Sequence, residues 1–279
     1  MWRSRLLRNR HAGLLVGLVC AALAAVATGQ ATAQQPVPLD VTGATRVEFD
    51  DSAGVWELLG NPVTVRRGLV VLQAPAVRYD TRDQIVIASS GVSYGDDVLT
   101  AFAGTVTVWV REGRAVAEGD VQVTTRGDAP IELRAARVEL LQKQRYLIAS
   151  GAARLVGGPS AITADQIAYD HAARRAVASG SVQAHTPDGI FSADRVEALV
   201  LAEELIADGH VVVTRGDLEA RAAHAVFRQQ AGQAELSGGA VVHLGRNTME
   251  APTITVDLRA RRVTATGGAH LVGYPAAPP

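Results

Sequence analysis

The chain has 279 residues, of which 48% are hydrophobic, and it carries 27 basic and 28 acidic side chains. This balance excludes a highly charged disordered tail and a basic nucleic-acid-binding protein. The only cysteine is Cys20, so the sequence also excludes internal disulfides and metal sites built from several cysteines.

The N-terminal segment, residues 1–33, has the three parts of a secretory signal peptide. Four arginines precede an uncharged apolar run at residues 12–27, and Ala31-Thr32-Ala33 supplies the small-x-small cleavage pattern. We therefore expect export to the periplasm, removal of residues 1–33, and a linker at residues 34–40. Two alternatives are an uncleaved inner-membrane anchor through residues 12–33 and a lipoprotein signal at Cys20, although Val19 is larger than the residue that such a signal requires.

A repeated pattern fills the rest of the chain. Eight alanines follow one another at nearly equal spacing, and an apolar β-branched residue stands three positions after each of them. The alanines are Ala44, Ala74, Ala103, Ala135, Ala164, Ala193, Ala223 and Ala251. The β-branched residues are Val47, Val77, Val106, Val138, Ile167, Val196, Val226 and Ile254. Two positions further come Phe49, Tyr79, Val108, Leu140, Tyr169, Ala198, Arg228 and Val256, so Arg228 is the polar exception.

Turn residues occur at two places in each repeat. One set follows the Val-x-Tyr-Asp half, as in Asp80-Thr81-Arg82-Asp83, and the other precedes the next alanine, as in Arg215-Gly216-Asp217. Two turns per repeat predict two strands per repeat, and connections this short join antiparallel strands. The sequence therefore predicts an all-β protein, a long antiparallel meander of about sixteen strands. An alternative is local helix at residues 192–208 and 218–236, which are rich in Ala, Glu and Leu, but a helix there would leave neighbouring strand edges unpaired.

A glycine stands sixteen positions after the alanine in seven of the eight repeats. Before it the apolar position is at an odd offset, and beyond it the apolar positions are at even offsets, as with Val116, Val121 and Val123 around Gly119. The inward face of the strand therefore changes at the glycine, which requires a bulge or a bend. Bends at equivalent places predict that the meander folds over itself into two facing layers with a shared apolar interior.

These residues resemble the OstA-like family of lipopolysaccharide-transport periplasmic proteins. The pattern Ala-x-x-Val-x-Tyr-Asp followed by Ala-x-Gly-x-Val occurs at residues 74–91 and again at residues 164–182, and the resemblance covers residues 41–271, followed by a flexible tail at 272–279. It implies an open β-jellyroll whose interior holds lipid acyl chains and whose edge strands join like domains of envelope transport proteins. The interior positions that it marks as lipid-groove candidates are Val106, Val108, Val138, Leu140, Ile167, Tyr169, Val196, Val226 and Ile254. The edge-strand positions that it marks for a partner are Val47, Phe49, Val263 and Ala265.

The sequence holds no catalytic motif. The histidines beyond the leader occur singly, with no carboxylate at metal-ligand spacing along the chain, so we expect neither a metal site nor a cofactor. Asp50, Asp80, Asp170 and Asp257 recur at strand ends, where an aspartate caps a turn. The two Arg-Gly-Asp triplets occupy one turn position of the repeat, so turn chemistry explains them better than receptor binding does.

The expected function is non-enzymatic binding and bridging of lipopolysaccharide, or of a related envelope glycolipid, during transport to the outer membrane. The partners would be the glycolipid, like jellyroll domains, and further copies joined head to tail. The alternative is a structural β-repeat scaffold, or a passenger-like β-solenoid, without lipid cargo. A closed and fully packed sandwich would favour that alternative, and a solenoid would show parallel pairing.

Overall fold

The computed structural model describes residues 40–67, 69–97, 99–126, 130–170, 172–186, 189–199, 202–228, 230–257, 260 and 262–273. Its regular elements are seventeen β-strands in one antiparallel sheet. In chain order they are β1 (Asp40–Asp50), β2 (Val55–Arg67), β3 (Val70–Asp80), β4 (Ile85–Gly95), β5 (Leu99–Trp109), β6 (Arg114–Thr125), β7 (Ile131–Leu141), β8 (Tyr146–Gly157), β9 (Ser160–Asp170), β10 (Arg175–Thr186), β11 (Gly189–Leu199), β12 (Glu204–Arg215), β13 (Leu218–Arg228), β14 (Gln233–Leu244), β15 (Asn247–Asp257), β16 (Arg262–Thr266) and β17 (His270–Val272). The signal peptide, the anchor alternative, the linker up to residue 39 and the tail from residue 274 lie outside the described residues.

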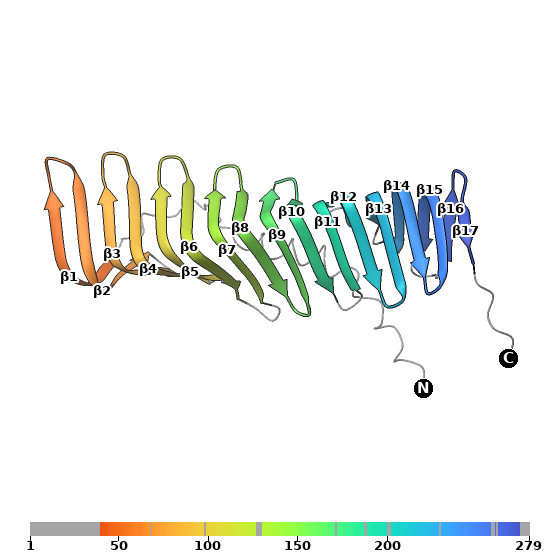
Figure 1. Cartoon of the computed structure of the whole chain (residues 1–279). Coiled ribbons are helices and arrows are strands. Elements are labelled where there is room, and N and C mark those ends of the chain that lie inside the picture. Colours follow the sequence, from red (N-terminus) through yellow and green to blue (C-terminus); the bar gives the residue numbers. More distant parts are fainter. Residues whose placement is uncertain are drawn as a thin grey trace, which may run out of the picture. The chain divides into compact units, whose positions relative to one another are not determined.

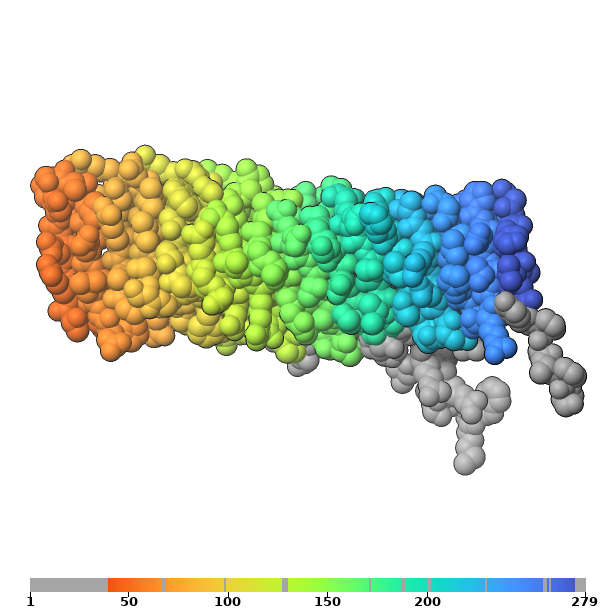
Figure 2. All heavy atoms as spheres, viewed as in Figure 1, coloured from red at the N-terminus to blue at the C-terminus, as the bar shows by residue number. Residues whose placement is uncertain are grey.

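The strands form two compact units, with β9 divided between them. The first unit contains β1 to β8 and the second contains β10 to β17. Within each unit the strands succeed one another in chain order (Figures 1 and 2). Every described register between consecutive strands is antiparallel, from β1 with β2 to β7 with β8 and from β10 with β11 to β15 with β16. The antiparallel meander is confirmed, and this pairing rules against a parallel β-solenoid.

The segments with helical composition are strands. Residues 192–208 lie mostly in β11 and β12, and residues 218–236 lie in β13 and β14. Pairing with neighbouring strands outweighs the helix propensity of alanine and glutamate there, because each strand supplies the hydrogen-bonding partners of the next.

The sixteenth predicted strand is divided into two. β16 pairs with residues 253–257 of β15, whereas β17 pairs with residues 248–250 of the same strand. Gly267 and Gly268 separate β16 from β17, and both have positive φ angles, +88° and +91°. The division therefore falls at the glycine that the repeat places in every even-numbered strand.

A bend is present as a shift of register in the middle of the strands. The predicted inward residue before Gly119 was wrong, because Val116 lies in the outward row with Thr107 and Glu139, and Ala117 takes the inward position. In the pairing of β7 with β8, the register breaks between Arg134 and Arg137, opposite Gly151 and Ala152. Both residues of β8 have positive φ, +79° for Gly151 and +53° for Ala152, a conformation in which glycine avoids the clash of a Cβ atom. β4 differs from β6 and β8, since Ser90 takes the first of the two positions and Gly91 the second, which explains why that glycine is one residue late.

Inward side chains from the two sides of the bend pack on each other. Val63, Ala74 and Val92 lie on one side of the bend, and Val77 and Ala88 lie on the other. The five side chains form one buried cluster. The sheet is thus folded into two facing layers over a common core, and it does not close on itself. This is the open jellyroll that the sequence predicted.

The aspartates at the strand ends cap turns, as predicted. Asp80 Oδ1 accepts hydrogen bonds from the backbone N–H groups of Arg82 and Asp83, both at 2.9 Å. The bond from Asp83 is the largest cause of a pKa of Asp80 below its ordinary value. Asp50, Asp170 and Asp257 each accept a backbone N–H from the residue three positions on.

The seventh repeat begins one residue earlier than the sequence pattern indicated. Ala222 is buried, and it stands midway along the sequence between Ala193 and Ala251, whereas Ala223 is exposed. Ala225 therefore takes the position three residues on, and it pairs with Ala207 and Leu236 in the inward row. The assignment of Ala223 as the repeat alanine was wrong because two adjacent alanines and two adjacent glycines, Gly238 and Gly239, gave the pattern two registers.

Candidate functional site

The interior has an innermost row of small side chains beside the bend. Alanine supplies this row in the odd-numbered strands and valine supplies it in most even-numbered strands. The row is fully buried, each side chain being at most 9% exposed. Its members are Val63, Ala74, Val92, Ala103, Val121, Ala135, Ala153, Ala164, Val182, Ala193, Val211, Ala222, Ala240 and Ala251. Alternation of a larger and a smaller side chain lets the two layers meet closely along this line.

The predicted groove positions lie in the next rows, on the other side of the bend. Val106, Val138 and Val196 belong to one row, and Val108 and Leu140 to the row beyond it, two residues nearer the turns. Val138, Val196, Ile167, Tyr169 and Ile254 are at most 7% exposed, whereas Val106, Val108 and Leu140 are half-buried. These eight side chains are therefore inward, but only three of them, Val106, Val108 and Leu140, are accessible.

Val226 is the exception among the groove candidates. It pairs with Ile206 and Glu235 in the row adjacent to that of Ala225, so it faces the opposite side of the sheet. Ala225 takes the inward position, and Phe227 takes the next inward position that the pattern had given to Arg228. Arg228 is correspondingly exposed and pairs with Glu204 and Glu235, at 3.2 Å from each.

The first strand exposes inward apolar side chains at the edge of its unit. Val47 is 55% exposed and Phe49 is 43% exposed, and within the first unit β1 is paired with β2 alone. The Phe49 ring stacks on Trp56 of β2, with ring centroids 4.4 Å apart and 26° between the planes. At the other terminus of the described chain, Val263 and Ala265 of β16 are half-buried and Leu271 of β17 is 61% exposed. The four predicted edge positions thus occupy terminal strands.

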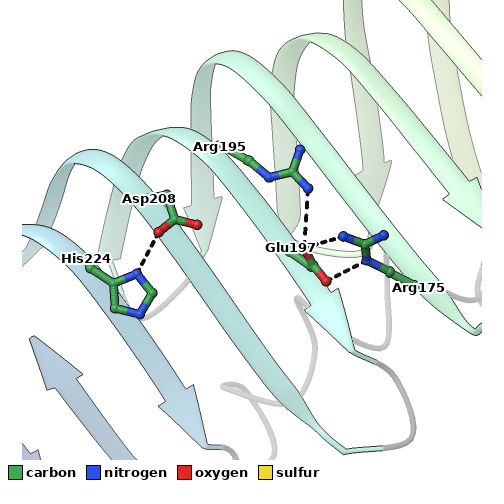
Figure 3. A network of polar contacts seen from close by, with 5 residues as sticks. All are labelled: Arg175, Arg195, Glu197, Asp208 and His224. Carbon is green, nitrogen blue, oxygen red and sulfur yellow. Dashed lines mark hydrogen bonds and ion pairs between the residues drawn. The ribbon is translucent and has the colours of Figure 1, made fainter.

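The outward face is held by ion pairs between neighbouring strands. Glu197 of β11 accepts hydrogen bonds from Arg175 of β10 at 2.6 Å and from Arg195 on its own strand at 3.3 Å (Figure 3). The hydrogen bond from Arg175 is the largest cause of a lowered pKa of Glu197. Glu139 is held in the same way in the first unit, where the hydrogen bond from Arg114 contributes most to its lowered pKa.

Sequence reasoning missed two histidine–aspartate pairs on the second unit. His224 Nδ1 lies 2.6 Å from Asp208 Oδ1, and His210 Nδ1 lies 2.8 Å from Asp194 Oδ2 (Figure 3 shows the first pair). The partners are sixteen positions apart in both pairs, which is the separation that joins adjacent strands across one hairpin. A search for carboxylates sixteen positions from each histidine, instead of three or four positions as on a helix, could have found both pairs.

Across the described residues, no group of three or more His, Cys, Asp or Glu side chains is placed to hold a metal ion. The carboxylates named above cap turns or pair with arginines and histidines at strand junctions. The feature with the greatest extent is instead the set of inward apolar rows.

A family comparison identifies the repeat. Residues 161–262, which extend from β9 to the start of β16, match the family described as LptA/(LptD N-terminal domain) LPS transport protein. The resemblance to the OstA-like family is confirmed. The OstA-like match ends at the strand that is divided in two.

Among solved structures, the chain is similar to LptH, described as the LptA homologous periplasmic component of the conserved lipopolysaccharide transport device from Pseudomonas aeruginosa. The identity is 20% and the TM-score is 0.40, over 46% of this chain and 100% of that chain. The comparison with curated proteins found no match. No helix in the described part of the chain is long and apolar enough to span a membrane.

Proposed function

We propose that this chain is a non-enzymatic periplasmic protein that binds lipopolysaccharide, or a related envelope glycolipid, and passes it toward the outer membrane. The observation that carries the proposal is the pair of facing layers lined by apolar rows within a sheet that stays open, in a chain whose second unit matches a lipopolysaccharide-transport domain. Transfer of a dozen methylenes from water to such an interior is worth roughly 10 kcal/mol before ordering costs.

Site-specific photo-crosslinking tests the proposal. Benzophenone side chains at the half-buried inward positions Val106 and Val108 should form adducts with lipopolysaccharide. The matched control is Thr107, which lies between them on the same strand and faces outward. Adducts at Thr107 as frequent as those at its two neighbours would mean that the lipid touches only the outer surface, and the proposal would fail.

The proposed partners are like jellyroll domains that pair with the terminal strands. Suppose that β16 of one copy pairs with β1 of the next copy in the register in which β14 pairs with β15. Val263 would then lie opposite Phe49, and Ala265 would lie opposite Val47. The same register sets Arg262 opposite Asp50, so apolar rows and charges both match. Free strand edges support such pairing through main-chain hydrogen bonds.

Light scattering on charge variants tests this head-to-tail pairing. Arg262→Asp should weaken self-association, and the double variant R262D/D50R should restore it because the two charges are exchanged. A double variant that stays as dissociated as the single variant would contradict the proposed register. Assembly unchanged in both would contradict pairing through these strands.

One observation favours the scaffold alternative. Ile167 and Ile254 are 0% exposed and Tyr169 is 1% exposed, so the interior around them is filled by protein side chains. A protein without cargo would give no lipid adducts at any inward position while keeping its assembly.

A further inference from the structure

The accessibility of the inward rows changes along the first unit. In the row nearest the turns on one layer, Phe49 is 43% exposed and Trp56 is 38% exposed, and the row continues with half-buried Tyr79, Val86 and Val108. Leu147 of β8, in the same row, is 0% exposed. Ala115 of β6 and Leu140 of β7, also in this row, are half-buried, so the row is accessible from β1 to β7 and closed at β8.

The facing layer shows a similar gradient that ends earlier along the unit. Val65, Leu72, Tyr94 and Ala101, from β2 to β5, are half-buried. The row then closes, with Val123 at 6%, Leu133 at 3% and Leu155 at 0% exposed. Both layers are therefore accessible over β1 to β5. Beyond β5 this facing layer closes at β6, whereas the first layer closes at β8.

An added edge strand would not cover this stretch. A partner strand would lie about 4.8 Å beyond β1, whereas β5 lies four strand spacings, about 19 Å, on the other side of β1. Its side chains would reach the inward residues of β1 and β2, leaving Tyr94 and Val108 as they are. An occupant of the accessible interior must therefore lie between the layers.

The chemistry of the lining favours a long hydrocarbon chain. The side chains of these two inward rows in β1 to β5 are aliphatic or aromatic. The Tyr94 hydroxyl donates a hydrogen bond to Asp96 at 2.7 Å, so its polar end is satisfied away from the interior. No basic side chain lies in these two inward rows from β1 to β5, so they offer no counter-charge for an acidic head group.

We propose that the lipid acyl chains enter and lie in the interior of β1 to β5, beside the stacked Phe49 and Trp56, and that the leucines of β7 and β8 close the far end of this site. This inference rests on the proposed lipid-binding function and narrows it to one part of the first unit. The buried positions Val138, Ile167, Tyr169 and Ile254 are then packing residues that the acyl chains do not touch.

Tryptophan quenching tests the location, because Trp56 is inward and Trp109 is outward on the same unit. The chain has three tryptophans, so the full chain with W2F/W109F keeps Trp56 alone, and W2F/W56F keeps Trp109 alone. The probe is the fatty acid dibromostearate, whose bromine atoms quench indole fluorescence on contact. Saturable quenching of Trp56 by about twofold or more, with little change at Trp109, is expected for a chain enclosed in the site.

Two further variants separate the inference from the function on which it rests. In the Trp56-only chain, Val108→Lys places a charge in the inward row and should weaken the quenching, whereas Thr107→Lys on the outward side should not. A third reporter, Phe227→Trp with the three native tryptophans replaced, samples a half-buried inward position of the second unit.

Each outcome decides the matter. Quenching of Trp56 that V108K weakens supports the site. Quenching at residue 227 without quenching of Trp56 overturns the location and leaves lipid binding intact. Equal quenching of Trp56 and Trp109 would show nonspecific surface adsorption, which overturns the site, and no quenching at any reporter overturns both the site and the proposed function.

Discussion

Replacement of Gly151 by alanine should destabilise the first unit by about 2–5 kcal/mol. Gly151 has a φ of +79°, and an alanine in the left-handed region costs about 1–2 kcal/mol. The added Cβ would also lie 2.6 Å from the Cβ of Ala136 on β7, and overpacking of this kind costs about 1–3 kcal/mol. Ala136 cannot rotate away because its Cβ is fixed to the backbone.

Urea unfolding followed by circular dichroism measures this effect, and the chain offers matched controls. Gly158→Ala carries a similar backbone strain, with φ of +54°, but its Cβ would meet nothing within 4 Å, so it should show the backbone cost alone. In the double variant G151A/A136G the steric part should disappear. The natural precedent is the pair Gly104 and Gly119, in which a glycine already occupies the facing position.

Two results would refute this reasoning. If G151A destabilised the protein no more than G158A, the close approach of β7 and β8 at the bend would not exist. If A136G failed to recover stability in the G151A background, the clash would not be with Ala136. Recovery of about 1 kcal/mol or more would show that the two residues interact, since distant substitutions simply add.

Three further predictions address the core, the register and the ion pairs. Ile254→Ala, at a side chain that is 0% exposed, should lower the free energy of unfolding by about 2–5 kcal/mol in urea melts, and a loss below about 1 kcal/mol would contradict close packing in the second unit. Ala225→Arg should lower the melting temperature sharply because it buries a charge, whereas Val226→Arg should be tolerated; the reverse ranking would restore the register with Ala223 as the repeat alanine. The hydrogen bond from Arg175, and the weaker one from Arg195, lower the pKa of Glu197 in the folded chain. The stabilisation that they give is therefore present above the unfolded pKa near 4.5, and it is lost as the pH falls through the folded pKa. E197Q should therefore reduce the acid sensitivity of unfolding below about pH 4.5, and an unchanged pH profile would show that the ion pair contributes nothing.

The sequence was sufficient for the meander and for most of its register because the repeat reports packing directly. Ala135 and Val138 are inward on β7 because an alanine and a β-branched residue three positions apart straddle the shift of face, and the same offset recurs in the other strands. The pattern failed at Ala222 and Ala223, where two alanines in succession allow either residue to be inward. Only the pairing of Ala225 with Leu236 distinguishes the two registers, and a contact between strands is not visible in one segment of sequence.

The accessibility of the interior was less predictable. Val108 and Val138 have equivalent chemistry and neighbouring places in the repeat, yet the first is half-buried and the second is 7% exposed. Repeat position therefore fixes the face of a residue but not its exposure.

The repeat of two strands has a consequence for how such a protein changes in evolution. Each strand from β2 to β15 pairs with the strand before it and the strand after it, and the valine and alanine of the innermost row alternate with the same two-strand period in most repeats. Duplication or loss of one whole repeat would therefore join old neighbours in an unchanged register, and would alter the span by two strand spacings, about 10 Å. Natural selection can adjust the reach of the molecule by genetic copying alone, without redesigning any contact.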